Sequence, residues 1–155
     1  MQFSASLDRD ANRQQIQSNE AFKAESTWTF VAGTTGAIAA HTLFTATGNM
    51  LVQVFGICDT DLTSGGAATI EVGVTGNTAG LIAQTTATGL DDGDIWMDAS
   101  PAVGVEALPG AFILNDGNDI ILTIATATLT AGVVDFYCLY RPLSSNGAVT
   151  VTTPA

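Results

Sequence analysis

The sequence predicts an all-β protein with an N-terminal arm: a β-sandwich or a small barrel, with the jelly roll as the leading candidate. The first observation is composition: 23 Ala, 22 Thr and 16 Gly make up 61 of the 155 residues, and small and β-branched residues favour strands over helices. The second is patterning, because short segments of alternating apolar and polar residues recur about every ten residues, with turn residues between them. Hydrophobic residues make up 46% of the chain and charged residues only 12%, which excludes a wholly disordered chain. We expect eight to ten strands.

The charge distribution divides the chain into an arm (1–25), a body (26–142) and a tail (143–155). The first 23 residues are polar, balance their charges and carry only sparse apolar residues. They fit either a frayed terminus or an arm that orders against a partner, and a short helix around 10–22 is compatible with both. From residue 24 onward there are 12 acidic residues and a single cation, Arg141, so the net charge of −11 belongs to the body.

The first half of the body holds five predicted strands, separated by Gly-rich turns. The densest, residues 50–58, places Val52, Val54 and Cys58 on one face. Met50, Phe55 and Ile57 indicate that its other face is apolar too, which is typical of a strand at the centre of a sandwich or in a subunit interface. The predicted strands of this half are 28–32, 37–46, 50–58, 69–75 and 81–86.

The second half begins with a short strand at 95–97 and a long Pro- and Gly-containing connection at 98–110. An Asp-Gly step at 116–117 predicts a hairpin between a strand at 111–114 and one at 119–128. Residues 133–141 form the last predicted strand, with Val134, Phe136, Cys138 and Tyr140 on one face. Asp135, Tyr137, Leu139 and Arg141 lie on the other face, Pro142 ends the strand, and residues 143–155 read as a tail.

The charge balance excludes several classes of partner. With 4 Lys+Arg against 15 Asp+Glu, the chain lacks the cations that a nucleic-acid binder or a polybasic membrane tether needs. No apolar run is long enough to span a bilayer, and the N-terminus does not resemble a signal peptide. We therefore expect synthesis in a reducing cytoplasm, with Cys58 and Cys138 buried on strands and unpaired; a disulfide between them is the alternative.

No catalytic, cofactor or metal site is predicted. The acidic stretch from Asp91 to Asp98 lacks the ligand spacing of an EF-hand and is better explained as a solvated turn, with weak calcium binding as the alternative. His41, the only histidine, is expected in the core or at an interface, and no nucleophile–base motif accompanies it. Glu71 and Glu106 are enough in number for the carboxylate pair of a glycosidase, but such an enzyme also needs a substrate groove, usually aromatic, and the spacing of the aromatic residues indicates core positions. We expect no enzyme activity.

Three segments carry a family resemblance: 48–62, 69–98 and 119–147, with the run from Phe136 to Gly147 the most distinctive. They resemble the small structural proteins encoded in the head or tail gene clusters of tailed bacteriophages. The resemblance covers about half of the chain and most of the predicted body. It implies a virion component made in the host cytoplasm, such as a capsid decoration (cement) protein on the head surface.

Residues and resemblance together give the functional expectation. A decoration protein would bind the major capsid protein and stabilise the shell; a tail, fibre or receptor-binding module of the virion and a carbohydrate-binding β-sandwich are the alternatives. Apolar groups on both faces of 50–58 and 133–140 predict self-association, and the resemblance implies a trimer. The arm holds three of the four cations, so we expect it to contact the capsid or a neighbouring subunit. The expected contact residues are Phe3, Leu7, Arg9, Arg13, Ile16, Phe22 and Lys23.

Overall fold

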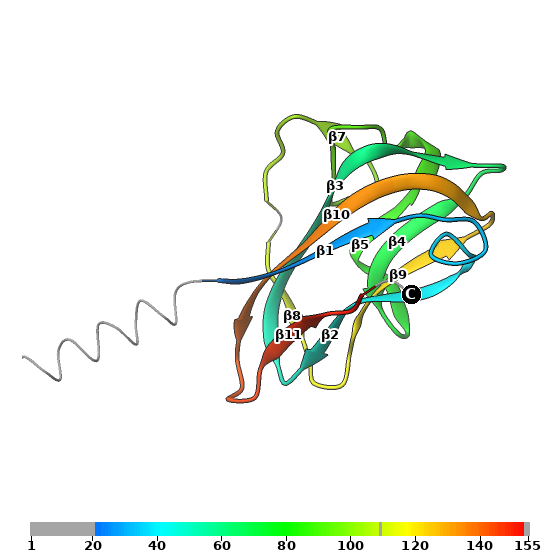
Figure 1. Cartoon of the computed structure of the whole chain (residues 1–155). Coiled ribbons are helices and arrows are strands. Elements are labelled where there is room, and N and C mark those ends of the chain that lie inside the picture. Colours follow the sequence, from blue (N-terminus) through cyan, green and yellow to red (C-terminus); the bar gives the residue numbers. More distant parts are fainter. Residues whose placement is uncertain (1–20, 109, 154–155) are drawn as a thin grey trace, which may run out of the picture.

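Two β-sheets packed face to face account for the described part of the chain, residues 21–108 and 110–153, in a computed structural model (Figure 1). Sheet A has six strands in the order β1-β10-β3-β6-β7, with β8 also paired to β3. Sheet B has five strands in the order β11-β2-β9-β4-β5. The all-β sandwich predicted from the sequence is confirmed, and within these residues helical structure is confined to one 3-10 turn, Ala87–Gly89. No helix in them is long and apolar enough to cross a bilayer.

The strand pairings are nested and antiparallel: β1 pairs with β10, β2 with β9, β3 with β6, and β4 with β5. The pairings are therefore nested around the β4–β5 hairpin, as the predicted jelly roll requires. The strands are β1 (Phe22–Thr29), β2 (Ala39–Thr47), β3 (Met50–Ser64), β4 (Thr69–Val74), β5 (Asn77–Thr86), β6 (Asp94–Trp96), β7 (Ala102–Val103), β8 (Phe112–Leu114), β9 (Ile120–Ala125), β10 (Leu129–Pro142) and β11 (Ala148–Val151).

The core lies between the sheets and is filled by the inward side chains of alternating strands. On β10, Val134, Phe136 and Cys138 are fully buried, as their period of two predicts. Phe136 packs edge-on against Trp96 of β6, with 6.1 Å between ring centroids. In sheet B, the side chains of Ile120, Leu122 and Ile124 of β9 are likewise buried. The core is continuous from β1 to β11.

Both cysteines lie where the sequence placed them, buried on strands and unpaired. Cys58 is on β3 and Cys138 on β10, and both face the core. Burial raises the pKa of the Cys58 thiol to about 11 and that of the Cys138 thiol to about 12. Because the thiolate is the reactive form, both groups are inert at neutral pH.

Three boundaries differ from the sequence prediction. β1 begins at Phe22, so residues 22–25, assigned to the arm, pair with β10 as part of sheet A. The tail contains β11, which pairs with β2 at the edge of sheet B. The long connection at 98–110 contains β7, which pairs with β6. In each case a short, weakly patterned segment becomes a strand because an existing strand edge supplies its hydrogen-bond partners.

The hairpin predicted at the Asp-Gly step is wrong. Gly117 does adopt the left-handed conformation of a turn, with φ +85°. However, β8 pairs with β3 in sheet A while β9 belongs to sheet B, so the turn joins the two sheets. The Asp116 carboxylate accepts a hydrogen bond from the Gly48 amide at 2.8 Å, which ties the turn to the β2–β3 loop.

The sequence prediction puts Met50 on the wrong face of β3. Its side chain is fully buried, and alternation puts it on the inner face of β3 with Val52 and Val54. The outer face of β3 nevertheless remains apolar, because it carries Leu51, Phe55 and Ile57, all half-buried.

Candidate interaction surface

The outer face of sheet A carries large apolar side chains where a sandwich ordinarily meets water. The register aligns Leu139 of β10 with Gln53 of β3, Tyr137 with Phe55, and Asp135 with Ile57. Ile95 of β6 continues the row of Ile57, and Ile113 of β8 lies beside Leu51. Ile113 is 76% exposed, and the other apolar residues of the face are half-buried. We call this set the apolar face: Leu51, Phe55, Ile57, Ile95, Ile113, Tyr137 and Leu139.

A stacked aromatic pair forms the middle of the apolar face. The rings of Phe55 and Tyr137 lie 5.2 Å apart between centroids and are nearly parallel, at 19°. The Lys23 ammonium lies 5.7 Å from the Tyr137 ring centroid, in cation–π range, and 2.8 Å from the Glu25 carboxylate. Tyrosine and charged groups arranged in this way are typical of protein interfaces, where an apolar centre has a polar rim.

These neighbours also perturb the protonation of the cluster. Partial burial, followed by the negative charges of Glu25 and Asp135, raises the pKa of the Tyr137 hydroxyl. The hydrogen bond from Lys23 to Glu25 raises the pKa of the Lys23 ammonium. Both groups therefore keep their protons at neutral pH, and the face presents a phenol and an ammonium.

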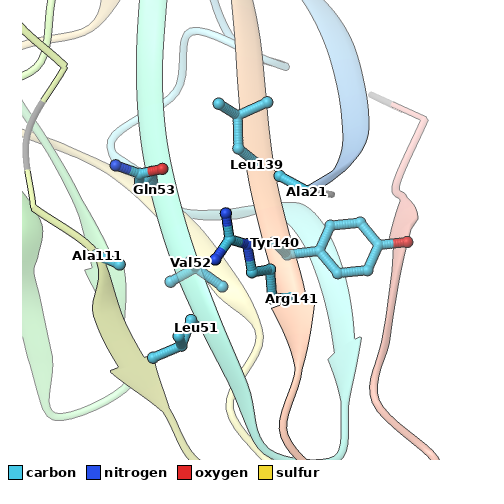
Figure 2. A pocket seen from close by; sticks show the side chains of 8 residues that line it. All are labelled: Ala21, Leu51, Val52, Gln53, Ala111, Leu139, Tyr140 and Arg141. Atoms are coloured by element: carbon cyan, nitrogen blue, oxygen red, sulfur yellow. The ribbon is translucent and has the colours of Figure 1, made fainter. Parts of the chain in front are cut away.

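A hollow of about 220 Å³ lies near one end of the apolar face (Figure 2). Its lining comes from β3, β10, the segment before β8 and the residue before β1, and Figure 2 shows side chains from β3 and β10 meeting there. Leu51, Leu139 and the stem of Arg141 make it partly apolar, and the Arg141 guanidinium adds a positive charge. The lining residues are Ala21, Leu51, Val52, Gln53, Ala111, Leu139, Tyr140 and Arg141.

The outer face of sheet B is different in kind. Its cross-strand rows pair small and hydroxyl-bearing residues, such as Thr45 with Thr150 and Ala40 with Thr123. Its charged residue, Glu71, accepts a hydrogen bond from Gln84 at 3.2 Å. Small and hydroxyl-bearing side chains are typical of a sheet face that is exposed to solvent, and nothing in this face indicates a binding site.

Two of the seven predicted contact residues lie in the described part of the chain. Lys23 points outward from β1 onto the apolar face. Phe22 is 51% exposed at the start of β1, and its ring stacks on that of Tyr140, 5.5 Å away. The other five, Phe3, Leu7, Arg9, Arg13 and Ile16, lie outside the described residues, as does most of the helix considered at 10–22.

The acidic loop uses its carboxylates to hold its own backbone. The Asp91 amide donates to the Asp94 carboxylate at 3.0 Å, and the Asp92 amide donates to that of Asp61 at 2.7 Å. These contacts are those of a turn stabilised by aspartate. In residues 21–108 and 110–153, no three His, Cys, Asp or Glu side chains converge to hold a metal ion.

His41 lies on β2, partly buried, beside the core rather than in a catalytic arrangement. Its ring packs edge-on against Trp28, with 5.6 Å between centroids, and its Nε2 lies 3.0 Å from the Ala37 carbonyl oxygen. The indole of Trp28 in turn donates to the Thr35 carbonyl at 3.3 Å. Through these contacts His41 packs against β1 and against the loop between β1 and β2.

The sequence predicts that β3 and β10 are apolar on both faces. It does not predict the hollow, nor that Arg141 lines it. A signal was present, because Arg141 is the only cation after residue 23. Ile113 was missed because its face depends on the pairing of β8 with β3, which the hairpin prediction excluded.

Comparisons with known proteins do not assign a family or a function to the chain. No family model matches the sequence, and no curated protein matches it. Among solved structures, the chain is similar to one in the cyanophage Pam1 capsid asymmetric unit, with a TM-score of 0.49 and 20% identity over 80% of this chain and 87% of that one. It is also similar to one in the acidic stable capsid structure of Helicobacter pylori bacteriophage KHP30, with a TM-score of 0.43 and 8% identity over 84% and 100% of the two chains. Structural similarity at this level does not assign a function to any surface residue of this chain.

Proposed function

We propose that this chain is a structural protein of a tailed-bacteriophage virion, and specifically a capsid decoration protein that binds the outer surface of the head and stabilises the shell. The observation that carries the proposal is the asymmetry of the surface. The described cations, Lys23 and Arg141, both lie on the outer face of sheet A, together with the half-buried residues of the apolar face and the exposed Ile113, whereas the other charged residues of the body are acidic.

The fold and the resemblance support the same class. Jelly rolls are common in viral capsid proteins and lectins, although a fold alone does not determine a function. The segments that resemble phage virion proteins, 48–62, 69–98 and 119–147, include β3, β4 to β6, β9 and β10. They therefore supply most of the apolar face.

The partners proposed are the major capsid protein and further copies of this chain. The apolar face offers one contact surface, and the arm, with Arg9 and Arg13, offers a second that can pair with acidic groups on a neighbour. A trimer is the proposed assembly. Contacts of modest strength, repeated over several arms, would together give firm attachment to a shell.

Copy number in purified particles tests this proposal. Quantitative mass spectrometry of virions is expected to find hundreds of copies of the chain per particle. A handful of copies would instead support the tail or fibre alternative, and absence from the particle, together with binding on a glycan array, would support a carbohydrate-binding module.

Arm deletion tests the attachment model. Because β1 begins at Phe22 and Phe22 stacks on Tyr140, the deletion should remove residues 2–20 and stop there. After circular dichroism confirms an all-β fold, the truncated chain is added to capsids that lack it. Reduced occupancy is expected, whereas full occupancy would reject the arm as the main contact and leave the body as the attachment surface.

A further inference from the structure

The hollow on sheet A combines features that suit a peptide segment. Leu51 and Leu139 face outward and offer an apolar contact, and Arg141 stands exposed beside them. Within the described residues, no carboxylate lies within ion-pair distance of Arg141. A partly apolar hollow with a cation beside it favours an occupant with apolar side chains and nearby carboxylates.

The chain that precedes the described residues enters the fold at this hollow. Ala21 is itself part of the lining, so residues 1–20 are attached to the edge of the site. An unstructured chain of twenty residues would have a root-mean-square end-to-end distance of about 25 Å. The apolar face from Leu51 to Ile57 spans about 20 Å along β3, since a strand rises about 3.3 Å per residue. Every residue of the segment can therefore reach the hollow.

The composition of residues 1–20 complements the lining. Phe3, Leu7 and Ile16 are the large apolar side chains of the segment after Met1, and Asp8, Asp10 and Glu20 supply carboxylates for Arg141. Arg9 and Arg13 carry the charge that complements the carboxylates of Glu25 and Asp135 on the outer face of sheet A. Attachment at Ala21 gives the segment a local concentration in the millimolar range, so even weak contacts would be populated.

We propose that in the free protein residues 1–20 dock in cis into the hollow formed by Leu51, Gln53, Leu139 and Arg141 on their own chain. The docked segment covers one end of the apolar face and leaves the Phe55–Tyr137 pair open. This inference goes beyond the proposed function, because it concerns the free chain and holds whatever the external partner is. An external partner that binds the arm must first displace it from the hollow, which weakens each contact by the free energy of the internal one.

Paramagnetic NMR on the full chain tests the proposal. A single cysteine is introduced by Ala11→Cys, between Leu7 and Ile16, and is labelled with a nitroxide; Cys58 and Cys138 do not react because they are buried and their thiols stay protonated. The amide signals of Leu51, Gln53 and Leu139 are expected to lose most of their intensity. Those of Thr45 and Thr123 on sheet B are expected to keep theirs. Equal loss on both sheets, or none at the hollow, would overturn the proposal.

A mixed sample separates docking in cis from exchange between copies. Spin-labelled chain without isotope label is mixed with isotope-labelled chain without a spin label, and no loss of intensity is expected at the hollow. Loss in the mixed sample as strong as in the single sample would show that the arm enters the hollow of another copy, and the cis assignment would be wrong.

A matched pair of substitutions checks that the hollow itself is the receptor. In the spin-labelled chain, Leu139→Asp is expected to restore the signals of Leu51 and Gln53, because it places a carboxylate in the apolar part of the lining. Ile95→Asp changes an equally half-buried residue of the same sheet face outside the hollow, and is expected to leave the intensity loss unchanged. If both substitutions restore the signals, or neither does, the hollow is not the receptor.

Discussion

The inner faces of the two sheets are both apolar and buried, but their outer faces differ in side-chain composition. Sheet B turns Thr, Ala and one Glu–Gln pair toward solvent, whereas sheet A presents Phe55, Tyr137 and a row of aliphatic residues. The inner faces of both are accounted for by the core between them. The core between the sheets does not need the apolar groups outside sheet A, and this difference is the reason that we propose the outer face of sheet A as the interaction surface.

The largest expected effect is on the free energy of unfolding, and it separates substitutions on the inner face of β10 from those on its outer face. Phe136→Ala should lower the free energy of unfolding by about 3–5 kcal/mol, because it leaves a cavity against Trp96 in the core. Tyr137→Ala, one residue along on the outer face, should cost about 1 kcal/mol from its stacking on Phe55. Urea denaturation followed by tryptophan fluorescence measures both, and equal losses would contradict the assignment of the two faces.

Alkaline pH should destabilise the protein through its inner faces. The folded pKa values of Cys58 and Cys138, about 11 and about 12, lie above the usual 9.0. The folded state therefore holds its thiol protons where the unfolded state loses them, so this stability is complete below pH 9 and is lost as pH rises toward 12. Denaturation midpoints should fall over that range.

The alkaline effect has a direct control. Cys138→Ala should flatten the pH dependence above pH 9, because it removes the more strongly perturbed thiol. An unchanged slope would mean that groups other than the thiols cause the loss.

Substitutions on the two outer faces should separate association from folding. Phe55→Ala is expected to weaken self-association or capsid binding by about 2 kcal/mol, or about 30-fold, as for a central interface aromatic residue. Thr45→Ala on sheet B, the matched control, is expected to change neither. Analytical ultracentrifugation and capsid co-sedimentation measure these effects, and a loss of binding with the Thr45 variant would move the interface to sheet B.

The smallest effect concerns charge on the apolar face. Glu25→Gln should lower the pKa of the Tyr137 hydroxyl, because the charge of Glu25 helps to raise it. Ultraviolet titration can follow this in a Tyr140→Phe background, which leaves Tyr137 as the only tyrosine. A pKa that stays the same or rises would show that Glu25 does not act on the phenol.

Much of the fold could be predicted from the sequence, because alternation is a local signal. The faces of β9 and β10 and the burial of both cysteines followed from it. Strand β11 was missed because a short run of small residues becomes a strand only through pairing with β2. The hairpin at 116–117 was wrong because local chemistry fixes the turn, whereas the sheet that each flanking strand joins depends on distant partners.

The candidate surface was predictable only in part. Apolar residues on both faces of β3 and β10 are visible in the sequence and predicted a covered surface. The hollow is not, because it forms where four separate segments meet, around Ala21, Leu51, Ala111 and Leu139. Bringing these residues together requires the register of β10 with β3 and of β8 with β3, which alternation alone does not determine.

Hydroxyl-radical footprinting of the chain, free and in purified virions, tests the central claim most directly. If the outer face of sheet A is the interaction surface, oxidation of Phe55, Tyr137 and Ile113 should fall markedly on assembly. Exposed residues away from that face, such as Val151 of β11, should react equally in both states. Protection confined to sheet B, or no protection of Phe55 and Tyr137 in the particle, would contradict the account.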